Sequence, residues 1–553
     1  MTEYPQPTEH RAWWFDAAAR WWSVPALVGV VTACRLVWLV WFSDYTLIED
    51  EAHYWEWSRR IDWSYYSKGP GVAWSIWAST SLFGHTEWAV RLPAVLAGAA
   101  GSIAAALLTR EIVREHTRAH PAQRGAPFVA AALYQCVPAI GVTGVLMTID
   151  GPFLACWTLA CFGAARALLH DRPRAWIVVG GALAMGFLFK YTIVLLVPGL
   201  VAAMLARASW RRRARAHIGW VAAAALVASL GLVPVGIWNA QNDWATVRHL
   251  LGHLGAPGGD TAHQSKDPWT PLWALEYVGL LVAMGGPVLI LGAVAWYERR
   301  KLGAGLVFAT ACSVPIALVY FGVSLVAQTE GNWAIAAVCA LVAPSAWLVI
   351  DGVSRRDAAV RILWGAALFT GFAVALALPV LPALSRVGRL GEKIPVHRMT
   401  GMRAHAAAVQ DRLDALAAQT GGEPFVIAEH YGRASQLAFY LPGRPTVFCA
   451  SAYVGGRRTQ YDVWAGTDLS NDATIDALRG RPAVILGGRR AQWAAAFDPV
   501  FDIGQLAGEP KANRTAWIGY DYADIRAYER RWAEGLDPIA RPTPNPNAPG
   551  GPP

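Results

Sequence analysis

Long apolar runs dominate this chain and restrict its fold more than any other feature. A helix of about 20 residues crosses the hydrocarbon core of a bilayer, which is roughly 30 Å thick. Eleven stretches approach or exceed that length, namely residues 23–42, 87–109, 127–147, 152–169, 175–189, 191–206, 217–238, 272–297, 303–326, 331–350 and 362–384. We therefore predict a polytopic α-helical membrane protein with about eleven spans. The weakest of these predictions are the short segments 175–189 and 191–206, which meet at Lys190.

Composition agrees with a membrane class and excludes several others. Of the 553 residues, 55% are hydrophobic and only 16% are charged, whereas about a quarter of a soluble chain is charged. The net charge is +9, of which residues 385–553 carry only +3, so no basic face for nucleic acid is indicated. Six of the seven cysteines lie in apolar runs, a pattern that gives neither a disulfide framework nor a metal knuckle.

The distribution of Lys and Arg predicts the orientation in the membrane. With the N-terminus in the cytoplasm, the inner loops hold 17 basic residues and the outer loops hold 7, as the positive-inside rule requires. An odd number of spans then places the C-terminal part outside. Frequent Arg, Ala and Gly favour a bacterial inner membrane, with that part in the periplasm.

Changes in composition along the chain predict its domains. The polar start contains Trp pairs that suit an interfacial segment, and the end is rich in Pro, Asn and Gly. Short β-like runs at 425–429, 446–449 and 483–486 alternate with helical stretches such as 402–418, which indicates a small extracytoplasmic α/β domain. The predicted regions are a cytoplasmic interfacial segment at 1–22, a transmembrane domain at 23–384 with a long outer loop at 43–91, the α/β domain at 385–537, and a disordered tail at 538–553.

The loop after the first span is the most informative stretch for chemistry. Glu49, Asp50 and Glu51 open a predicted helix whose later turns carry Trp55 and Trp57. Acids at a helix N-terminus complement the helix dipole and cap the first turn without any chemistry; alternatively, they face a cleft. Adjacent residues point about 100° apart on a helix, so Asp50 and Glu51 do not both aim at one reacting atom. We take Asp50 as the better candidate.

Several motifs resemble those of a known group of membrane enzymes. The acidic pair and the segment Tyr65–Pro70 look like the first outer loop of the protein mannosyltransferases and lipid A aminoarabinose transferases, which are glycosyltransferases of the GT-C type. The resemblance extends in order and spacing over residues 20–385; it is strongest over residues 49–93, and the later pieces are weaker matches. The matching pieces are Phe83–Gly84, Arg91–Pro93, Thr148–Pro152, Lys190–Tyr191 and Glu330–Trp333.

The resemblance implies a GT-C-like fold and transfer of a sugar from a polyprenyl-phosphate carrier, without a nucleotide sugar. The acceptor is a hydroxyl of a lipid, glycan or protein at the outer face of the membrane. In this group an outer-loop acid serves as general base, a role that here falls on Asp50 with Glu51 as its neighbour. One carboxylate near the acceptor suits inverting transfer, because a hydroxyl becomes more nucleophilic as its proton leaves, an effect worth about 10²- to 10⁴-fold.

The departing lipid phosphate needs cationic help as its negative charge grows. Lys68 and Lys190 are the candidates, since the chain contains only 6 Lys against 42 Arg. Alternatively, Lys190 extends from a helix end toward the headgroups and Lys68 decorates a loop. We favour a functional role for Lys68, which lies inside the motif, and leave both interpretations of Lys190 open.

Three further residues are candidates for donor or substrate binding. Asp150 precedes Gly151 and Pro152, a pattern that fits a simple helix start; the resemblance instead implies an acid near the donor site. Tyr66 belongs to the motif, and Arg59 is a candidate phosphate ligand, although arginines at an interface usually only anchor a helix.

A metal site is weakly indicated. The loop 239–271 contains His249, His253, Asp260 and His263, and histidines four residues apart can share a metal on a helix. Some relatives carry an acidic metal ligand directly before the motif lysine, where this chain has Ser67. We therefore assign no cofactor and no metal, and keep a divalent cation only as an open possibility.

Two other classes of function compete with the enzyme. A lipid or glycan transporter or flippase would carry charges deep in its spans, where this sequence has mainly Arg35 and Glu276. A non-catalytic partner in envelope assembly would use the outer domain for binding.

Overall fold

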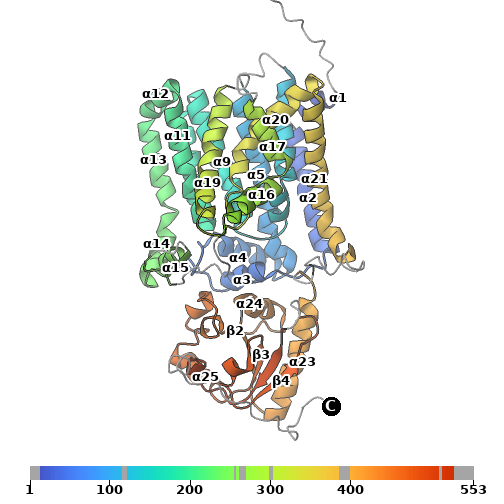
Figure 1. Cartoon of the computed structure of the whole chain (residues 1–553), viewed down its shortest axis with the longest axis vertical. Coiled ribbons are helices and arrows are strands. Elements are labelled where there is room, and N and C mark those ends of the chain that lie inside the picture. Colours follow the sequence, from blue (N-terminus) through green and yellow to red (C-terminus); the bar gives the residue numbers. More distant parts are fainter. Residues whose placement is uncertain are drawn as a thin grey trace, which may run out of the picture. The chain divides into compact units, whose positions relative to one another are not determined.

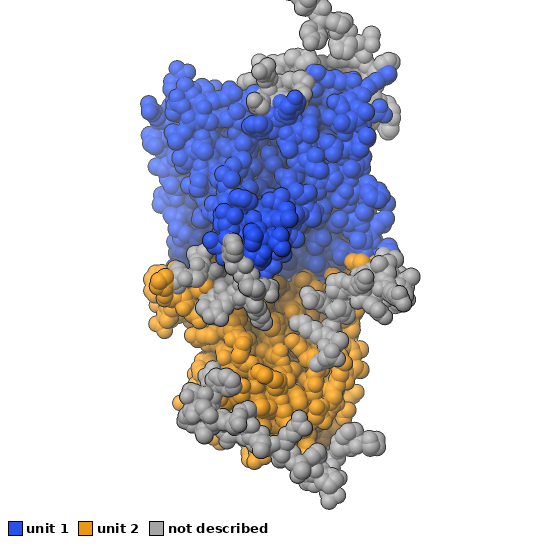
Figure 2. Space-filling model, viewed as in Figure 1, with its two compact units in different colours: residues 1–43, 68–238, 263–380 blue, residues 44–67, 239–262, 381–553 orange. Residues whose placement is uncertain are grey.

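The computed structural model describes residues 13–20, 22–114, 121–253, 257–260, 270–297, 303–384, 396, 399–509 and 514–528. The chain forms two compact units, which Figure 2 colours separately. Unit 1 consists of residues 1–43, 68–238 and 263–380, and unit 2 of residues 44–67, 239–262 and 381–553. Each unit is therefore assembled from three separate segments of the chain. The predicted tail at 538–553 and residues 1–12 of the predicted interfacial segment lie outside the described residues.

Unit 1 is helical (Figure 1). Its α-helices are α1 (Trp13–Ala18), α2 (Ser23–Val37), α4 (Gly71–Phe83), α5 (Glu87–Val113), α7 (Ala126–Cys136), α8 (Pro138–Thr143), α9 (Asp150–His170), α10 (Trp176–Phe189), α11 (Leu196–Ala206), α12 (Ala208–Ala216), α13 (Ile218–Ser229), α14 (Leu232–Gln241), α16 (Leu272–Gly285), α17 (Pro287–Tyr297), α19 (Ala304–Ser324), α20 (Ala337–Ser354) and α21 (Ala358–Leu384). Helices α14 and α21 begin in unit 1 and end in unit 2. A π-helix, η1 (Trp38–Phe42), extends α2, and the short 3-10 helices η2 (Pro121–Gly125), η3 (Pro173–Ala175) and η4 (Tyr191–Leu195) connect other helices.

The described residues contain seven helices that are long and apolar enough to cross a membrane, and up to nine if two bent helix pairs each count as one. The prediction of a mostly helical protein with several spans is therefore confirmed. Seven predicted segments correspond to these helices, and two others, 191–206 and 272–297, take part in the bent pairs. The remaining two, 127–147 and 175–189, form the shorter helices α7 with α8 and α10. The number eleven stays a prediction.

Burial differs strongly among the membrane helices of unit 1. In α9 and α20, 78% of the apolar window is buried, against 17% in α2 and 11% in α21. Small residues allow the helices to approach closely: a Cβ on Gly180 of α10 would lie 2.4 Å from the carbonyl oxygen of Ala224 in α13, as is typical of helix contacts in membranes. Helices α5, α9 and α20 thus form the centre of unit 1, where a fixed arrangement of polar groups can be held.

Unit 2 combines helices with a small sheet. Its α-helices are α3 (Glu49–Ser58), α15 (Ala245–His253), α23 (Met402–Thr420), α24 (Tyr431–Tyr440), α25 (Asp472–Leu478) and α26 (Arg490–Trp493), with turns η6 (Ser451–Tyr453) and η7 (Gln460–Asp462). The strands are β1 (Phe425–Ala428), β2 (Phe448–Cys449), β3 (Ala483–Leu486), β4 (Val500–Gly504) and β5 (Ala516–Gly519). They lie in the order β2-β1-β3-β5-β4.

The sheet is parallel in its first half and antiparallel in its second. Strand β1 pairs in parallel with β2 and β3, placing Ile427 opposite Ile485, whereas β5 pairs antiparallel with β3 and β4. Strands β1 and β3 are buried throughout, which agrees with their continuous apolar sequence. They lie where the sequence predicts strands; β4 and β5 were not predicted.

The segment 44–67 is anchored to the C-terminal part of unit 2 by its backbone. The N–H of Leu47 donates to the Tyr440 hydroxyl at 2.7 Å, and the Leu47 carbonyl accepts from the Gln436 side chain at 2.8 Å. Helix α3 then packs against α24. These contacts fix the start of α3, and with it Asp50, relative to residues more than 380 positions later.

Candidate functional site

Asp50 lies in the first turn of α3 and is exposed. The Tyr431 hydroxyl at the start of α24 donates to Asp50 Oδ1 at 3.4 Å. Burial, followed by the charge of Asp50, raises the pKa of Tyr431, so this hydroxyl keeps its proton and remains a donor. An exposed carboxylate that accepts a hydrogen bond from a neutral donor suits proton transfer to or from a bound molecule.

Glu51 has a different environment. Its side chain is fully buried, and its Oε2 accepts a hydrogen bond from the backbone N–H of Ile48 at 3.1 Å. This is the return half of a capping box, which satisfies one of the free N–H groups at the helix start. Glu51 thus serves the helix cap, whereas the neighbouring Asp50 carboxylate is exposed.

Arg59, at the end of α3, is held by several groups. Its Nη1 pairs with buried Glu56 at 3.0 Å, its Nη2 donates to the Arg444 carbonyl at 2.8 Å, and the guanidinium lies 5.1 Å from the Trp55 ring centroid. These contacts connect α3 to the segment that follows α24. A phosphate would therefore have to compete with existing partners for this side chain.

Tyr66 is buried and linked to residues of the 239–262 segment. Its hydroxyl donates to Asp260 Oδ2 at 2.5 Å, and its ring centroid lies 4.7 Å from that of His249. Burial and the Asp260 carboxylate raise the pKa of Tyr66. His249 Nδ1 also lies 3.9 Å from Asp260 Oδ1. Of the other residues in the weak metal hypothesis, the side chain of His253 and all of His263 lie outside the described residues.

In unit 1, three separate motifs meet in one polar cluster. Lys190 Nζ donates to Asp150 Oδ1 at 2.7 Å, and the Asn332 amide donates to Asp150 Oδ2 at 2.8 Å. Lys190 Nζ also lies 3.4 Å from the Asn332 carbonyl oxygen and 5.4 Å from the Phe153 ring centroid. Both charged side chains are largely buried, with exposed fractions of 10% for Lys190 and 6% for Asp150. We call Asp150, Lys190 and Asn332 the buried cluster.

Helix ends favour the charges of the buried cluster. Asp150 is the first residue of α9 and Lys190 directly follows the last residue of α10. A carboxylate at an N-terminus and an ammonium at a C-terminus both complement the helix dipole. The two charges therefore stabilise each other and the two helix ends, which explains how they are tolerated in a buried position.

The loop that carries Lys68 lies next to the end of α10. A Cβ on Gly69 would lie 2.4 Å from the Leu188 carbonyl oxygen, and a Cβ on Gly71 would lie 3.1 Å from the Phe189 side chain. Only glycine permits such close approach of the two backbones. Lys68, which is half-buried, thus precedes a segment that packs against the two residues before Lys190.

The structure thus brings together some predicted site residues and separates others by unit. Asp150 and Lys190 are in contact within unit 1, which also contains Lys68, whereas Asp50, Glu51, Arg59 and Tyr66 belong to unit 2. Asn332 and Tyr431, which contact Asp150 and Asp50, were not among the predicted site residues. Asn332 lies in a motif that was noted only as a weak match, and Tyr431 lies 381 positions after Asp50 with no local signal.

Comparison with known proteins confirms the resemblance that the motifs indicate. The family model of dolichyl-phosphate-mannose-protein mannosyltransferases matches residues 67–238. The lipid A galacturonosyltransferase RgtD of Rhizobium johnstonii is 30% identical over 315 residues, which cover 54% of this chain and 60% of that protein. An undecaprenyl phosphate-alpha-4-amino-4-deoxy-L-arabinose arabinosyl transferase of Pseudomonas aeruginosa is 29% identical over 49% of this chain and 51% of its own length. The chain therefore spans about half to three fifths of these curated relatives.

Solved structures show the fold. The crystal structure of ArnT from Cupriavidus metallidurans in the apo state superposes with a TM-score of 0.62 at 14% identity, covering 90% of this chain and 98% of that one. The same protein bound to undecaprenyl phosphate gives a TM-score of 0.60 at 15% identity. The chain thus has an ArnT-like fold of the GT-C type.

Proposed function

We propose that this chain, of which residues 67–238 match the mannosyltransferase family model, is a membrane glycosyltransferase that uses a polyprenyl-phosphate-linked sugar. The acceptor is a hydroxyl at the outer face of a bacterial inner membrane, and Asp50 is the general base. The observation that carries the proposal is the exposed Asp50 carboxylate at the start of α3, within the motif-bearing loop and oriented by Tyr431.

The chemistry requires a base and a cation. Asp50 removes the proton of the acceptor hydroxyl as its oxygen attacks the anomeric carbon, and the bond from that carbon to the lipid phosphate breaks with inversion. Of the two lysines, we assign the leaving phosphate to Lys68. Lys68 lies within the segment Tyr65–Pro70, which carries the strongest part of the resemblance. A charge-assisted hydrogen bond to the leaving oxygen is stronger than one between neutral groups.

The other predicted binding residues receive supporting roles in this proposal. The buried cluster holds the ends of α9 and α10 together beside the Lys68 loop. Tyr66, through Asp260, holds the end of the loop segment against residues 239–262. Arg59 reinforces α3 through Glu56 and the Arg444 carbonyl. Each of these residues would position groups that touch the substrates.

The names of the relatives suggest the substrate class. One relative is a lipid A galacturonosyltransferase, and others are transferases of 4-amino-4-deoxy-L-arabinose from undecaprenyl phosphate. We propose a glycolipid of the lipid A type as the acceptor and undecaprenyl phosphate as the carrier of the sugar. By their names, the first relative transfers a uronic acid and the others transfer an aminopentose, so both kinds of sugar are candidates here.

The proposal also includes a membrane topology. It has eleven crossings, a cytoplasmic N-terminus and a periplasmic C-terminal domain, with the regions 1–22, 23–384, 385–537 and 538–553 as predicted from the sequence. The positive-inside bias of 17 against 7 basic residues supports this orientation. It places Asp50 and the ends of α9 and α10 that bear the buried cluster on the outer side.

The decisive experiment compares Asp50→Asn with a matched control, Asp44→Asn. Asp44 is also exposed, lies six residues earlier in the same segment, and undergoes the same chemical change. Each variant is expressed in a bacterial strain that lacks its own lipid A glycosyltransferases, and lipid A is examined by mass spectrometry. We expect the unaltered chain and Asp44→Asn to add one sugar mass, and Asp50→Asn to lower the rate by about 10²- to 10⁴-fold.

Expression level and thermal stability of each variant are measured in parallel. Wild-type transfer by a well-expressed Asp50→Asn protein would overturn the role of Asp50. Unchanged lipid A with the unaltered, well-expressed chain would overturn the proposed acceptor. If the chain is instead a flippase or an assembly partner, neither substitution should change the cellular phenotype of the strain that expresses it.

A further inference from the structure

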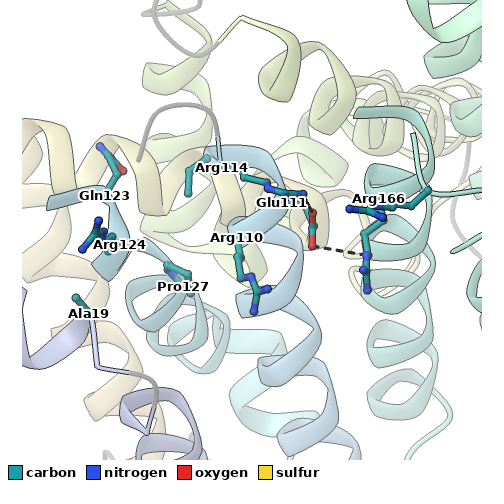
Figure 3. A pocket seen from close by; sticks show the side chains of 10 residues that line it. Ala19, Arg110, Glu111, Arg114, Gln123, Arg124, Pro127 and Arg166 are labelled. Carbon is teal, nitrogen blue, oxygen red and sulfur yellow. Dashed lines mark ion pairs between the residues drawn. The ribbon is translucent and has the colours of Figure 1, made fainter. Parts of the chain in front are cut away.

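A cavity of about 500 Å³ lies in unit 1, at the end of α9 away from Asp150 (Figure 3). Of the ten residues that line it, five are arginines and one is an acid, Glu111. The arginines come from separate elements: Arg110 and Arg114 from the end of α5, Arg124 from η2, Arg166 from α9, and Arg172 from the turn after α9. Their convergence therefore does not follow from a single basic run in the sequence.

The charge of the cavity is only partly balanced. Glu111 Oε1 lies 3.7 Å from Arg166 Nε, and its Oε2 lies 3.9 Å from Arg114 Nη1 and 3.6 Å from His170 Nε2. Figure 3 shows Glu111 between Arg114 and Arg166. Within the described part of the chain, no carboxylate pairs with Arg110, Arg124 or Arg172. Three guanidinium groups thus remain to attract an anion.

Buried contacts hold the walls of the cavity in place. Glu111 has an exposed fraction of only 8%, and its backbone carbonyl lies 2.7 Å from His170 Nε2, which ties the end of α5 to the end of α9. Gln123 is buried, and its amide donates to the Trp347 carbonyl of α20 at 3.3 Å. The site is therefore built before any ligand arrives, which reduces the entropy lost on binding.

This cavity is separate from the buried cluster of unit 1. Arg166 lies sixteen residues after Asp150 along α9, which corresponds to about 24 Å at a helical rise of about 1.5 Å per residue. That distance approaches the thickness of the hydrocarbon core. Arg110, Arg124 and Arg172 also belong to the loops that the sequence predicts to be cytoplasmic.

We propose that this cavity binds the phosphate group of an anionic ligand, either the headgroup of an acidic phospholipid in the inner leaflet or a soluble phosphate compound. Guanidinium groups form paired hydrogen bonds with phosphate oxygens, and basic pockets between transmembrane helices on the cytoplasmic side suit anionic headgroups. The volume of about 500 Å³ is within the range of ordinary ligand pockets.

The test uses the purified full-length chain and native mass spectrometry with added phosphatidylglycerol, cardiolipin or phosphatidylcholine. The cavity variant replaces Arg110, Arg124 and Arg172 by Gln. The control variant replaces Arg174, Arg212 and Arg215 by Gln, three exposed arginines that do not line the cavity. At about fivefold per arginine near a membrane surface, we expect the cavity variant to lose about hundredfold in affinity for anionic lipid and the control to lose much less.

A competition with inorganic phosphate distinguishes the two sources of ligand. If millimolar phosphate does not displace the bound anionic lipid, the result supports a lipid headgroup as the ligand. If inorganic phosphate binds to the cavity and displaces the lipid, the result supports a soluble phosphate compound. Equal losses in the cavity and control variants, or equal affinity for phosphatidylcholine, would overturn the site. If the triple variant does not fold, the single substitutions Arg110→Gln and Arg124→Gln replace it, each with about a fivefold loss expected.

Discussion

Asp50 and Asp150 look alike in the sequence but differ in the structure. Each lies in the first turn of a helix, where a carboxylate simply complements the dipole. Asp50 is exposed and accepts a hydrogen bond from the neutral hydroxyl of Tyr431 at 3.4 Å. Asp150 is buried, with one oxygen 2.7 Å from an ammonium and the other 2.8 Å from an amide.

This comparison shows that position on a helix does not decide whether an acid can act as a base. A carboxylate whose charge is balanced in a buried site stabilises the fold, and protonating it would leave the cation without its partner. An exposed carboxylate can accept a proton with little effect on stability. The comparison therefore predicts opposite consequences of the same substitution, Asp to Asn, at positions 50 and 150.

The largest expected effect is on stability at Asp150. Asp150→Asn leaves the buried Lys190 ammonium without its carboxylate, which should lower the free energy of unfolding by about 3–5 kcal/mol. The double variant Asp150→Leu with Lys190→Met removes both charges and should recover most of that loss. Thermal unfolding of the purified protein, with Asp50→Asn as the matched control, measures these differences.

Asp50→Asn should change stability by no more than about 0.5 kcal/mol, as is usual for a surface substitution. Two results would contradict the comparison. One is an Asp150→Asn protein as stable as the original chain; the other is a double variant that loses as much stability as Asp150→Leu and Lys190→Met lose together when each is made alone.

Asp462 sharpens the comparison because it is a buried acid held by neutral donors, the backbone N–H of Thr459 at 2.7 Å and its hydroxyl at 3.1 Å. Burial raises its pKa to about 6, above the ordinary value of about 3.9. The folded state therefore keeps the proton to a higher pH than the unfolded state. Stability from this group is present below about pH 4 and falls by about 3 kcal/mol as the pH rises to about 6.

Thermal unfolding between pH 4 and 7 tests this expectation. Asp462→Asn should flatten the fall in that window, whereas the exposed control Asp411→Asn should preserve it. An equal slope in Asp462→Asn and the original chain would show that burial of this carboxyl does not determine the pH dependence.

The smallest effect is expected for the partner of Asp50. Tyr431→Phe removes the hydroxyl that orients the carboxylate, and a hydrogen bond of ordinary strength corresponds to about twofold to tenfold in kcat. The KM for the lipid-linked donor should not change, because the contact is to the base. Tyr520→Phe, which removes a hydroxyl bonded to Gln419 elsewhere in unit 2, is the control. A fall in kcat that is equal in both variants would assign Tyr431 a structural role only.

The sequence predicts elements of this protein better than it predicts contacts. Apolar length locates nearly all the membrane helices, but the break between α7 and α8 arises because Pro138 disfavours helix at the residue before it. Gly286, with a φ of 59°, separates α16 from α17 in a similar way. Both breaks lie at residues whose stereochemistry is known to interrupt helices, and both are visible in the sequence.

Contacts within the site are harder to predict from the sequence. The capping role of Glu51 follows from its position three residues after Ile48. In contrast, Lys190 is 40 residues from Asp150 and Asn332 is 182 residues from it. Those pairings depend on which helix ends meet, and apolar periodicity carries no information on that.

The three-part composition of unit 2 has a consequence for biosynthesis. Residues 44–67 leave the ribosome well before residues 381–553, to which they are joined in the unit. Translation at roughly 5–20 residues per second leaves a delay of about 15–60 s. During that interval Trp55 and Trp57, which are fully buried in the finished protein, lack their later-made neighbours. A nascent chain that stalls before residue 381 would therefore present an aromatic surface to chaperones and proteases.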